Sequence, residues 1–407
     1  MTTPARIPGR RLLHAPGPTP IPDEVLHAMM RQPLDHGDPR LAAVIGACED
    51  GLRRLLDAPA GSELFLYASN GHGVWEAVVE NLLPPGGRVL IPGTGHFSES
   101  WAIQTEALGR QVLRTPWQPG FPIDPAAVTE ALRADRERTV RAVFVVHTDT
   151  SSGVTSDLAA LRAAIDAADH PALLVVDGVA SFGAAPFSMQ ALRCDVALGA
   201  SQKGLMCPPG VGFIAVDGAA MTAAKANPAP RYYWDWVMRQ SALSYRKFCG
   251  TAPQNLVAGL EAALGLIFQE GLAAVWARHR LLAGAVQAAV AAWSQAGALG
   301  FFCRVPEARS VSVTTITVPA GTDVDALRDV ARERFEVAFA GALGPLTGQA
   351  FRIGHLGDQN AAQILGCLGG IEAAMAVRGI PFGAGGTAAA VAALAAGDGP
   401  SGGAWSG

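Results

Sequence analysis

The sequence predicts an α/β protein with a large domain on a mostly parallel sheet and a smaller C-terminal α+β domain. Between about residues 65 and 215, helical patterns alternate with short apolar runs, as they do in successive βαβ units. The runs are continuously apolar, which is typical of strands that are buried on both faces of a parallel sheet. After about residue 255 the spacing of helices and strands becomes less regular, which indicates a second domain.

The elements follow in this order. A Pro- and Gly-rich segment over residues 1–22 predicts an irregular arm, and Asp23 is placed to cap a helix that runs through Met30. One crossover helix is expected over Asp157–Ala168, entered through Thr155 and Ser156. The strands of the large domain are expected at Arg88–Ile91, Ala142–His147, Ala172–Asp177, Val196–Leu198 and Gly212–Val216.

The C-terminal part begins with one long Ala-rich helical pattern over residues 255–296. A strand over 310–318, a helix over 323–335, a strand over 351–354 and a helix over 361–377 follow. Glycine and alanine dominate thereafter. These changes predict an arm over 1–22, a large domain over 23–265, a small domain over 266–385 and a flexible tail over 386–407.

Composition excludes several classes of function. The net charge of −4 and the lack of a basic run argue against a nucleic-acid partner. The longest apolar stretch, near Leu281–Trp293, is too short to span a membrane, and the first residues carry no secretory signal pattern. The six cysteines form no CxxC pairs, so we expect no metal site, no disulfide framework and a cytoplasmic location.

Lysine is scarce in this chain. Lys203, Lys225 and Lys247 are the only lysines among 31 basic residues, and the others are arginines, which keep their proton near neutral pH. Lys203 lies in an apolar, Gly-rich segment, which favours amine chemistry. Coding bias explains the count equally well, so the neighbouring residues have to decide.

Asp177 ends one predicted strand, and Lys203 follows the next one. Ligands of parallel sheets bind beyond the carboxyl ends of the strands, so both side chains are expected in one crevice. An Asp and a Lys directed at one ligand suit pyridoxal phosphate, because the amine can form a Schiff base and the carboxylate can keep the pyridine nitrogen protonated. A strand-end Asp and an unrelated Lys remain the alternative.

Two further segments fit this cofactor. The segment Tyr67–Ala77 opens a helix with two glycines, and its backbone N–H groups can bind a phosphate, although a tight turn with a cap would look the same. The segment His147–Gly153 presents hydroxyls and a carboxylate at another strand end, although a plain Ser/Thr turn is the alternative.

Together and in this order, these segments resemble the fold-type I, class V aminotransferases over nearly the whole chain, from about Leu13 to Ala393. The resemblance is closest to the bacterial serine–glyoxylate aminotransferases and their alanine–glyoxylate relatives. It implies a fold-type I pyridoxal-phosphate-dependent transferase with a seven-stranded, mostly parallel sheet in the large domain. The matching segments are Pro16–Pro22, Asp35–Pro39, Ser69–Gly73, Gly93–Phe97, His147–Val154, Gly199–Met206 and Phe351–Gly357.

The resemblance implies a role for each site residue. Lys203 would form the Schiff base and move the Cα proton, and Asp177 would pair with the pyridinium nitrogen. Arg352 would bind the substrate α-carboxylate through its planar fork. Thr251 would reach the phosphate of the neighbouring subunit, which implies a homodimer. The other cofactor contacts would be Val179 and Phe97 on the two ring faces, Thr150 near the phenolic oxygen, and Asn70, Gly71, His72 and Gln202 at the phosphate.

The chain departs from the family pattern at three positions. Gly250 stands where an aromatic residue usually precedes the threonine, Asn70 replaces Ser or Gly, and Asp149 stands where Glu is common. These departures leave the amino donor and the intersubunit contact open.

The implied activity is a ping-pong transfer of an amino group from serine or alanine to glyoxylate or a similar 2-oxo acid. The alternatives are aspartate–glyoxylate, pyridoxamine–pyruvate and aminophosphonate–pyruvate transaminases, and a lyase such as cysteine desulfurase, for which Cys303 lies in a strand-like context. A non-enzymatic protein on the same scaffold is the remaining class.

Overall fold

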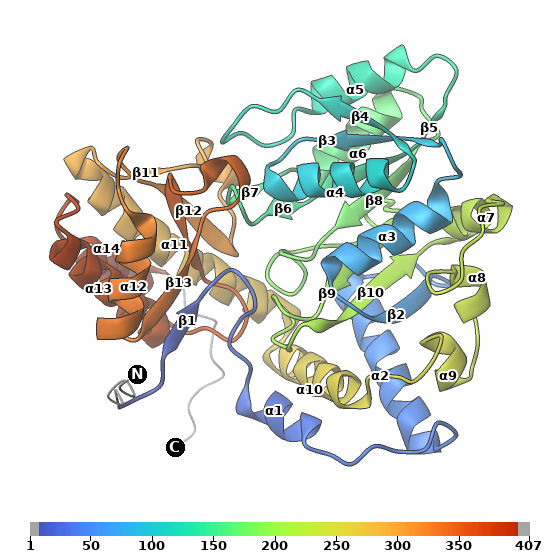
Figure 1. The fold of residues 1–407 in the computed structure, drawn as a ribbon, viewed down its shortest axis with the longest axis horizontal. Helices are drawn as coiled ribbons and strands as arrows, with labels where there is room; N and C mark the ends of the chain where they lie inside the picture. Colours follow the sequence, from blue (N-terminus) through green and yellow to red (C-terminus); the bar gives the residue numbers. More distant parts are fainter. Residues whose placement is uncertain (1–7, 398–407) are drawn as a thin grey trace.

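Two β-sheets organise the computed structural model of this chain, which describes residues 8–397 (Figure 1). The seven-stranded sheet has the order β2-β10-β9-β8-β5-β3-β4, and β10 is antiparallel to both of its neighbours while the other pairs are parallel. This confirms the predicted mostly parallel sheet. Its strands are β2 (Glu63–Ser69), β3 (Arg88–Pro92), β4 (Gln111–Thr115), β5 (Val140–Val146), β8 (Leu173–Asp177), β9 (Val196–Ala200) and β10 (Gly210–Val216).

Helices cover both faces of this sheet, because alternate residues of each strand point to opposite sides. In β2, Leu64 and Leu66 join one apolar core, and Phe65 and Tyr67 join the other. The first core includes side chains of α2 (Pro39–Leu56), α5 (Pro125–Ala134), α6 (Leu158–Ala167) and α10 (Gln254–Glu270). The second includes side chains of α3 (Gly71–Leu82), α4 (His96–Ala107) and α7 (Gly218–Ala226).

A five-stranded sheet with its own apolar core forms the second unit, on the left in Figure 1. Its strand order is β1-β13-β14-β12-β11. This core is separate from the two cores that flank the seven-stranded sheet. The predicted limit between the domains at residue 265 stays a prediction. The elements of this unit are β1 (Leu12–His14), β11 (Gly300–Phe301), β12 (Val313–Thr317), β13 (Val337–Gly341), β14 (Ala350–Gly354), α11 (Leu272–Trp293), α12 (Val324–Arg334), α13 (Ala361–Arg378) and α14 (Gly386–Ala396).

The N-terminal arm is more regular than the sequence predicted. Its apolar strand β1 completes the five-stranded sheet, where Leu12 lies opposite Val337 in parallel register. The arm then runs to α1 (Asp23–Met29), which packs on α10. Pro22, not Asp23, is the residue that precedes this helix, so the predicted Asp23 cap is wrong. The remaining short elements are β6 (Thr148–Asp149), β7 (Val154–Thr155), α8 (Trp236–Arg239) and α9 (Ser244–Lys247).

The long helical pattern after residue 254 is two helices. Gly271 has a φ of +88°, a left-handed conformation that favours glycine, and it separates α10 from α11. The two axes meet at 85°. Within residues 8–397 no single helix is both long enough and apolar enough to cross a membrane. Of the described helices, only the bent pair α10 and α11, taken together, has the length and composition for it.

The Gly/Ala-rich tail is also partly ordered, so its prediction as flexible from residue 386 is wrong for α14. Alanine has the highest helix propensity, and small side chains allow α14 to pack closely against α11. Ala390 is buried there, and Thr387 donates from its backbone nitrogen and its hydroxyl to Glu372. The rest of that predicted tail, residues 398–407, lies outside the described residues.

Candidate active site

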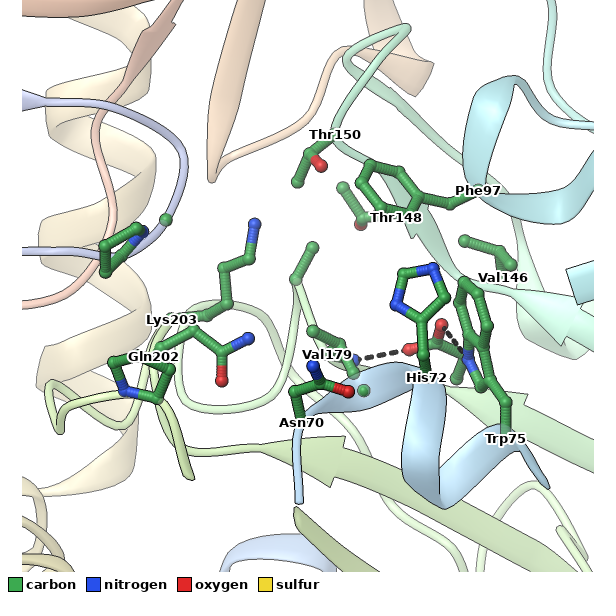
Figure 2. A pocket seen from close by; sticks show the side chains of 16 residues that line it. Asn70, His72, Trp75, Phe97, Val146, Thr148, Thr150, Val179, Gln202 and Lys203 are labelled. Atoms are coloured by element: carbon green, nitrogen blue, oxygen red, sulfur yellow. Dashed lines mark hydrogen bonds between the residues drawn. The ribbon is translucent and has the colours of Figure 1, made fainter. Parts of the chain in front are cut away.

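A cavity of about 300 Å³ opens at the carboxyl ends of the strands, between the seven-stranded sheet and the N-terminal arm. All predicted site residues line it except Arg352 and Thr251. Seven further residues line it, none of which was assigned a site role from the sequence: Gly17, Pro18, Trp75, Val146, Thr148, Ala180 and Pro209. Figure 2 shows Lys203 on one side and His72, Trp75 and Phe97 on the other. The predicted cofactor contacts that line the cavity are Asn70, Gly71, His72, Phe97, Thr150, Asp177, Val179, Gln202 and Lys203.

Lys203 lies in the turn that follows β9, beside the arm. Its Nζ donates a hydrogen bond to the carbonyl oxygen of Pro16. Gly17 has a φ of +127°, and a Cβ there would lie 2.5 Å from Cδ and Cε of Lys203, so the lysine passes directly over a glycine. Burial and, to a lesser extent, the charge of Arg352 lower the pKa of Lys203 to about 8, although Asp177 and Asp149 oppose the shift. This amine therefore loses its proton much closer to neutral pH than an ordinary lysine does.

Asp177 ends β8, and both of its carboxylate oxygens accept hydrogen bonds. Oδ1 accepts from the backbone nitrogen of Val179 at 2.7 Å, and Oδ2 accepts from Nε1 of Trp75 at 2.8 Å (Figure 2). Burial raises the pKa of Asp177 to about 6, and these two hydrogen bonds restrain the rise because they favour the charged form. The carboxylate is thus mainly ionised at neutral pH and suited to hold a cation.

The start of α3 forms an anion site on the floor of the cavity. Asn70 is the N-cap residue, and its Oδ1 accepts from the backbone nitrogen of Gly73 at 3.2 Å. Gly71 is buried at the first helical position, where N–H groups and the helix dipole favour negative charge. The Gln202 side chain also lines this cavity, and among residues 8–397 its buried Oε1 has no hydrogen-bond partner. Its amide NH2 group, a hydrogen-bond donor, is the part of this side chain that suits a phosphate beside the helix start.

Phe97 and the threonines come from two neighbouring elements. Phe97 lies in the first turn of α4, with its ring centroid 6.4 Å from that of Trp75. Thr148 and Thr150 belong to the β6–β7 hairpin that follows β5. Trp75 is the most important residue that the sequence did not reveal, and its only signal is a position one helical turn after Gly71.

Arg352 and Thr251 are the two predicted residues that do not line the cavity. Arg352 is 6 % exposed on β14; its Nε donates to the Gly341 carbonyl at 2.8 Å and its Nη1 to the Thr150 carbonyl at 2.9 Å. Its charge still acts on Lys203. Thr251 is exposed in the segment between α9 and α10. Their roles stay predictions.

The residues present fit pyridoxal phosphate as a set. A buried amine, a buried carboxylate with two hydrogen-bond donors and an anion-binding helix start surround one cavity. This arrangement, at the carboxyl edge of a mostly parallel seven-stranded sheet, defines a fold-type I transferase.

The sequence of the chain matches the family described as aminotransferase class-V over residues 11–340, and the chain belongs to this family. It is therefore an aminotransferase. A serine–glyoxylate aminotransferase of Methylorubrum extorquens is 38 % identical over 92 % of this chain and 93 % of its own length. An L-aspartate–glyoxylate aminotransferase of Paracoccus denitrificans is also 38 % identical, over 90 % and 91 %. The solved ureidoglycine–glyoxylate aminotransferase of Bacillus subtilis superimposes with a TM-score of 0.87 at 25 % identity, covering 96 % of this chain and 99 % of that one.

Proposed function

We propose that this aminotransferase binds pyridoxal phosphate and moves an amino group from serine or alanine to glyoxylate or a similar 2-oxo acid. The observation that carries the proposal is that Lys203, Asp177 and the start of α3 all line one cavity. The relatives from Methylorubrum and Paracoccus are both glyoxylate aminotransferases, which supports glyoxylate as the acceptor. The reaction would be ping-pong, so that the donor leaves as an oxo acid before the acceptor enters.

Each residue has a distinct task in this proposal. The bound cofactor would supply an electron sink for the α-carbon of the amino acid. Asp177 holds negative charge and a fixed orientation through Val179 and Trp75. Nζ of Lys203 takes the proton from the substrate Cα and returns it, and a pKa lowered to about 8 suits a base that acts near neutrality. Arg352 would bind the α-carboxylate with the N–H groups that its two backbone contacts leave over.

The proposal includes a homodimer in which Thr251 reaches the cavity of the neighbouring subunit. Thr251 is exposed, and the segments around it carry large exposed apolar side chains, which supports a subunit contact there. These side chains are Met30, Tyr232, Val237, Leu243 and Tyr245. Sedimentation should give a dimer, and a Thr251→Ala variant should remain dimeric with weaker cofactor binding. A monomer with full cofactor affinity would contradict this part.

A donor–acceptor panel tests the activity. Serine and glyoxylate should give hydroxypyruvate and glycine, and alanine should be tried beside serine. Lys203→Ala should abolish both the products and the lysine-dependent visible absorbance of the bound cofactor. The proposal fails if no small amino acid changes that absorbance in the wild-type protein.

Aspartate belongs in the same panel, because the aspartate–glyoxylate relative of Paracoccus is as similar to this chain as the serine–glyoxylate relative of Methylorubrum.

The lyase alternative has less support. Cys303 is buried, its thiol donates to the Val305 carbonyl at 3.3 Å, and burial raises its pKa, whereas a desulfurase needs a mobile, reactive cysteine. All six cysteines are free thiols, which supports a reducing compartment such as the cytoplasm.

A further inference from the structure

The β6–β7 hairpin lies between the two sheets, and Asp149 is its fully buried carboxylate. One oxygen, Oδ2, accepts from the backbone nitrogen of Phe97 at 2.9 Å and from the hydroxyl of Thr94 at 3.2 Å. The other, Oδ1, accepts from the backbone nitrogen of Ser151 at 2.9 Å and from its hydroxyl. Asp149 thus ties the hairpin to the start of α4.

This contact replaces an ordinary helix cap. The N-cap position of α4 is Gly95, which has no side chain to offer. A Cβ there would lie 2.9 Å from Cγ of Asp149 and 2.7 Å from Oγ of Ser151, so glycine leaves the space that the hairpin fills. Oγ of Ser151 accepts from the backbone nitrogen of His96 at 2.9 Å. The first turn of α4, which carries Phe97, is therefore positioned by another element.

The opposite side of the hairpin contacts the five-stranded sheet. The carbonyl of Thr150 accepts from Nη1 of Arg352 at 2.9 Å, and the carbonyl of Ser151 accepts from the hydroxyl of Thr315 at 3.2 Å. Gly153 has a φ of +68°, and a Cβ there would lie 3.2 Å from the nitrogen of Thr315. The hairpin is thus packed closely on both sides, and a shift at Asp149 would move both Phe97 and Arg352.

The charge of Asp149 also reaches the cavity. Its hydrogen-bond partners are neutral N–H and O–H groups of Thr94, Phe97 and Ser151. Three charged groups act on Lys203: Arg352, Asp177 and Asp149. Arg352 favours the neutral amine, and the two carboxylates favour the charged one.

We propose that Asp149 is a positioning residue that fixes Phe97 and Arg352 relative to each other through the hairpin, and that its buried charge contributes to the electrostatics at Lys203. This rests on the proposed function, in which Phe97 contacts the cofactor ring and Arg352 binds the substrate carboxylate. The distance between Phe97 and Arg352 then decides whether both ligands are held in the right relative position. The conservative change at this site is Asp149→Glu, which keeps the charge and lengthens the side chain by one methylene.

Four variants separate the two effects. Asp149→Asn removes the charge, and the new amide NH2 group faces N–H and O–H groups that are themselves donors. Ser151→Ala keeps the charge and removes one capping hydroxyl. Asp149→Glu keeps the charge and alters the spacing. The control is Asp135→Asn, since Asp135 is a buried carboxylate that accepts from Val140 and Thr139 at the opposite end of β5.

The first measurement is the pH dependence of amine labelling in the full-length, cofactor-free protein, read by mass spectrometry with formaldehyde and a borohydride. Lys225 and Lys247 serve as internal references. Asp149→Asn should lower the labelling midpoint of Lys203 by roughly 0.5 to 1 pH unit, because a neighbouring negative charge is lost. Ser151→Ala, Asp149→Glu and Asp135→Asn should keep the wild-type midpoint. An unchanged midpoint in Asp149→Asn would overturn the electrostatic part.

The second measurement is cofactor affinity together with the KM of the amino donor. Asp149→Asn should weaken both by roughly tenfold, the loss of a charge-assisted hydrogen bond, and Asp149→Glu and Ser151→Ala should weaken both by less. Asp135→Asn should leave both unchanged. Wild-type values in Asp149→Asn would overturn the positioning part. Failure of the proposed function would look different, because the wild-type protein itself would then transaminate no donor.

Discussion

Nε1 of Trp75 donates a 2.8 Å hydrogen bond to Oδ2 of Asp177 in a fully buried environment. The indole is held in place by stacking, since the ring of Trp101 lies 5.4 Å from it at an interplanar angle of 10°. Trp101 in turn stacks on Phe144 at 4.6 Å. The carboxylate at the end of β8 is therefore oriented by an aromatic stack that extends into the core.

Replacing Trp75 with phenylalanine should shift the acid limb of the pH profile of cofactor binding. The variant keeps an aromatic ring but loses the donor that favours the charged carboxylate, so the pKa of Asp177 in the cofactor-free protein should rise above about 6. Binding that needs the ionised form is lost as pH falls through this pKa, and the loss should begin roughly one pH unit higher than in the wild type. The measurement is the affinity of the cofactor-free protein for pyridoxal phosphate against pH.

Trp101→Phe is the matched control, because Nε1 of Trp101 is buried without a hydrogen-bond partner among the described residues. It should weaken the same stack while leaving the acid limb in place. Equal shifts in both variants would mean that packing, not the Trp75 hydrogen bond, controls Asp177.

Alanine at Gly17 should damage the site more than the fold. Its Cβ would meet the Lys203 side chain at 2.5 Å, and its φ of +127° is costly for any other residue. Gly61 has a φ of +85° with open space around the position of a Cβ, so Gly61→Ala isolates the backbone cost of about 1 kcal/mol. Both variants should lose comparable stability in denaturant, and only Gly17→Ala should lose Lys203 labelling and turnover. Full turnover in Gly17→Ala would show that Lys203 does not need this contact.

Buried histidines should make the protein acid-sensitive. Nδ1 of His279 donates to the Val275 carbonyl at 2.7 Å, and Nε2 accepts from the Gly357 nitrogen at 3.0 Å. Protonation of Nε2 would break the second hydrogen bond, so the neutral ring is favoured. Burial lowers its pKa from 6.5 to about 3. Between these values the unfolded chain binds a proton that the folded chain does not, so stability falls as pH drops below 6.5. The pKa values of His14, His147 and His355 are lowered in the same direction.

The effect of His279 can be isolated with His279→Gln, in which an amide oxygen can still accept from Gly357. The variant should be less stable at pH 7, and the difference from the wild type should narrow by about 1.4 kcal/mol per pH unit toward pH 5. Urea unfolding at both pH values measures this, with the exposed His27→Gln as control. Raised pKa values of about 6 at Asp177 and Asp195 oppose the trend in both proteins and cancel in the difference. A difference that stays constant with pH would contradict the assignment.

Thr387→Ala tests whether α14 is part of the folded unit. Loss of the 2.9 Å hydrogen bond from the Thr387 hydroxyl to Glu372 should cost about 1 kcal/mol in the free energy of unfolding. The exposed helical Thr222→Ala should cost nothing, since alanine is the better helix former. Equal effects would support the flexible tail that composition predicted.

Local patterns predicted the parts of the fold and site that depend on neighbouring residues in sequence. Continuous apolar runs placed the strands, and strand ends placed Asp177 and Lys203 at one edge. What the sequence could not show were contacts between distant segments. The pairing of Leu12 with Val337, the hydrogen bond from Trp75 and the passage of Lys203 over Gly17 leave no periodic signal. The break at Gly271 was missed because one glycine does not outweigh a long Ala-rich pattern.

The pairing of β1 with β13 has a consequence for the order of synthesis. The strands of the seven-stranded sheet end at Val216, so this sheet can form while much of the chain is still on the ribosome. Leu12 has no partner until Val337 has emerged. The N-terminal end of the arm is fixed only then, whereas Thr19 of the same arm hydrogen-bonds the backbone of Gln202 and Lys203 in the large domain. All residues that line the cavity lie between Gly17 and Pro209, so the cavity can form first, and the second sheet then fixes the far end of the arm that covers it.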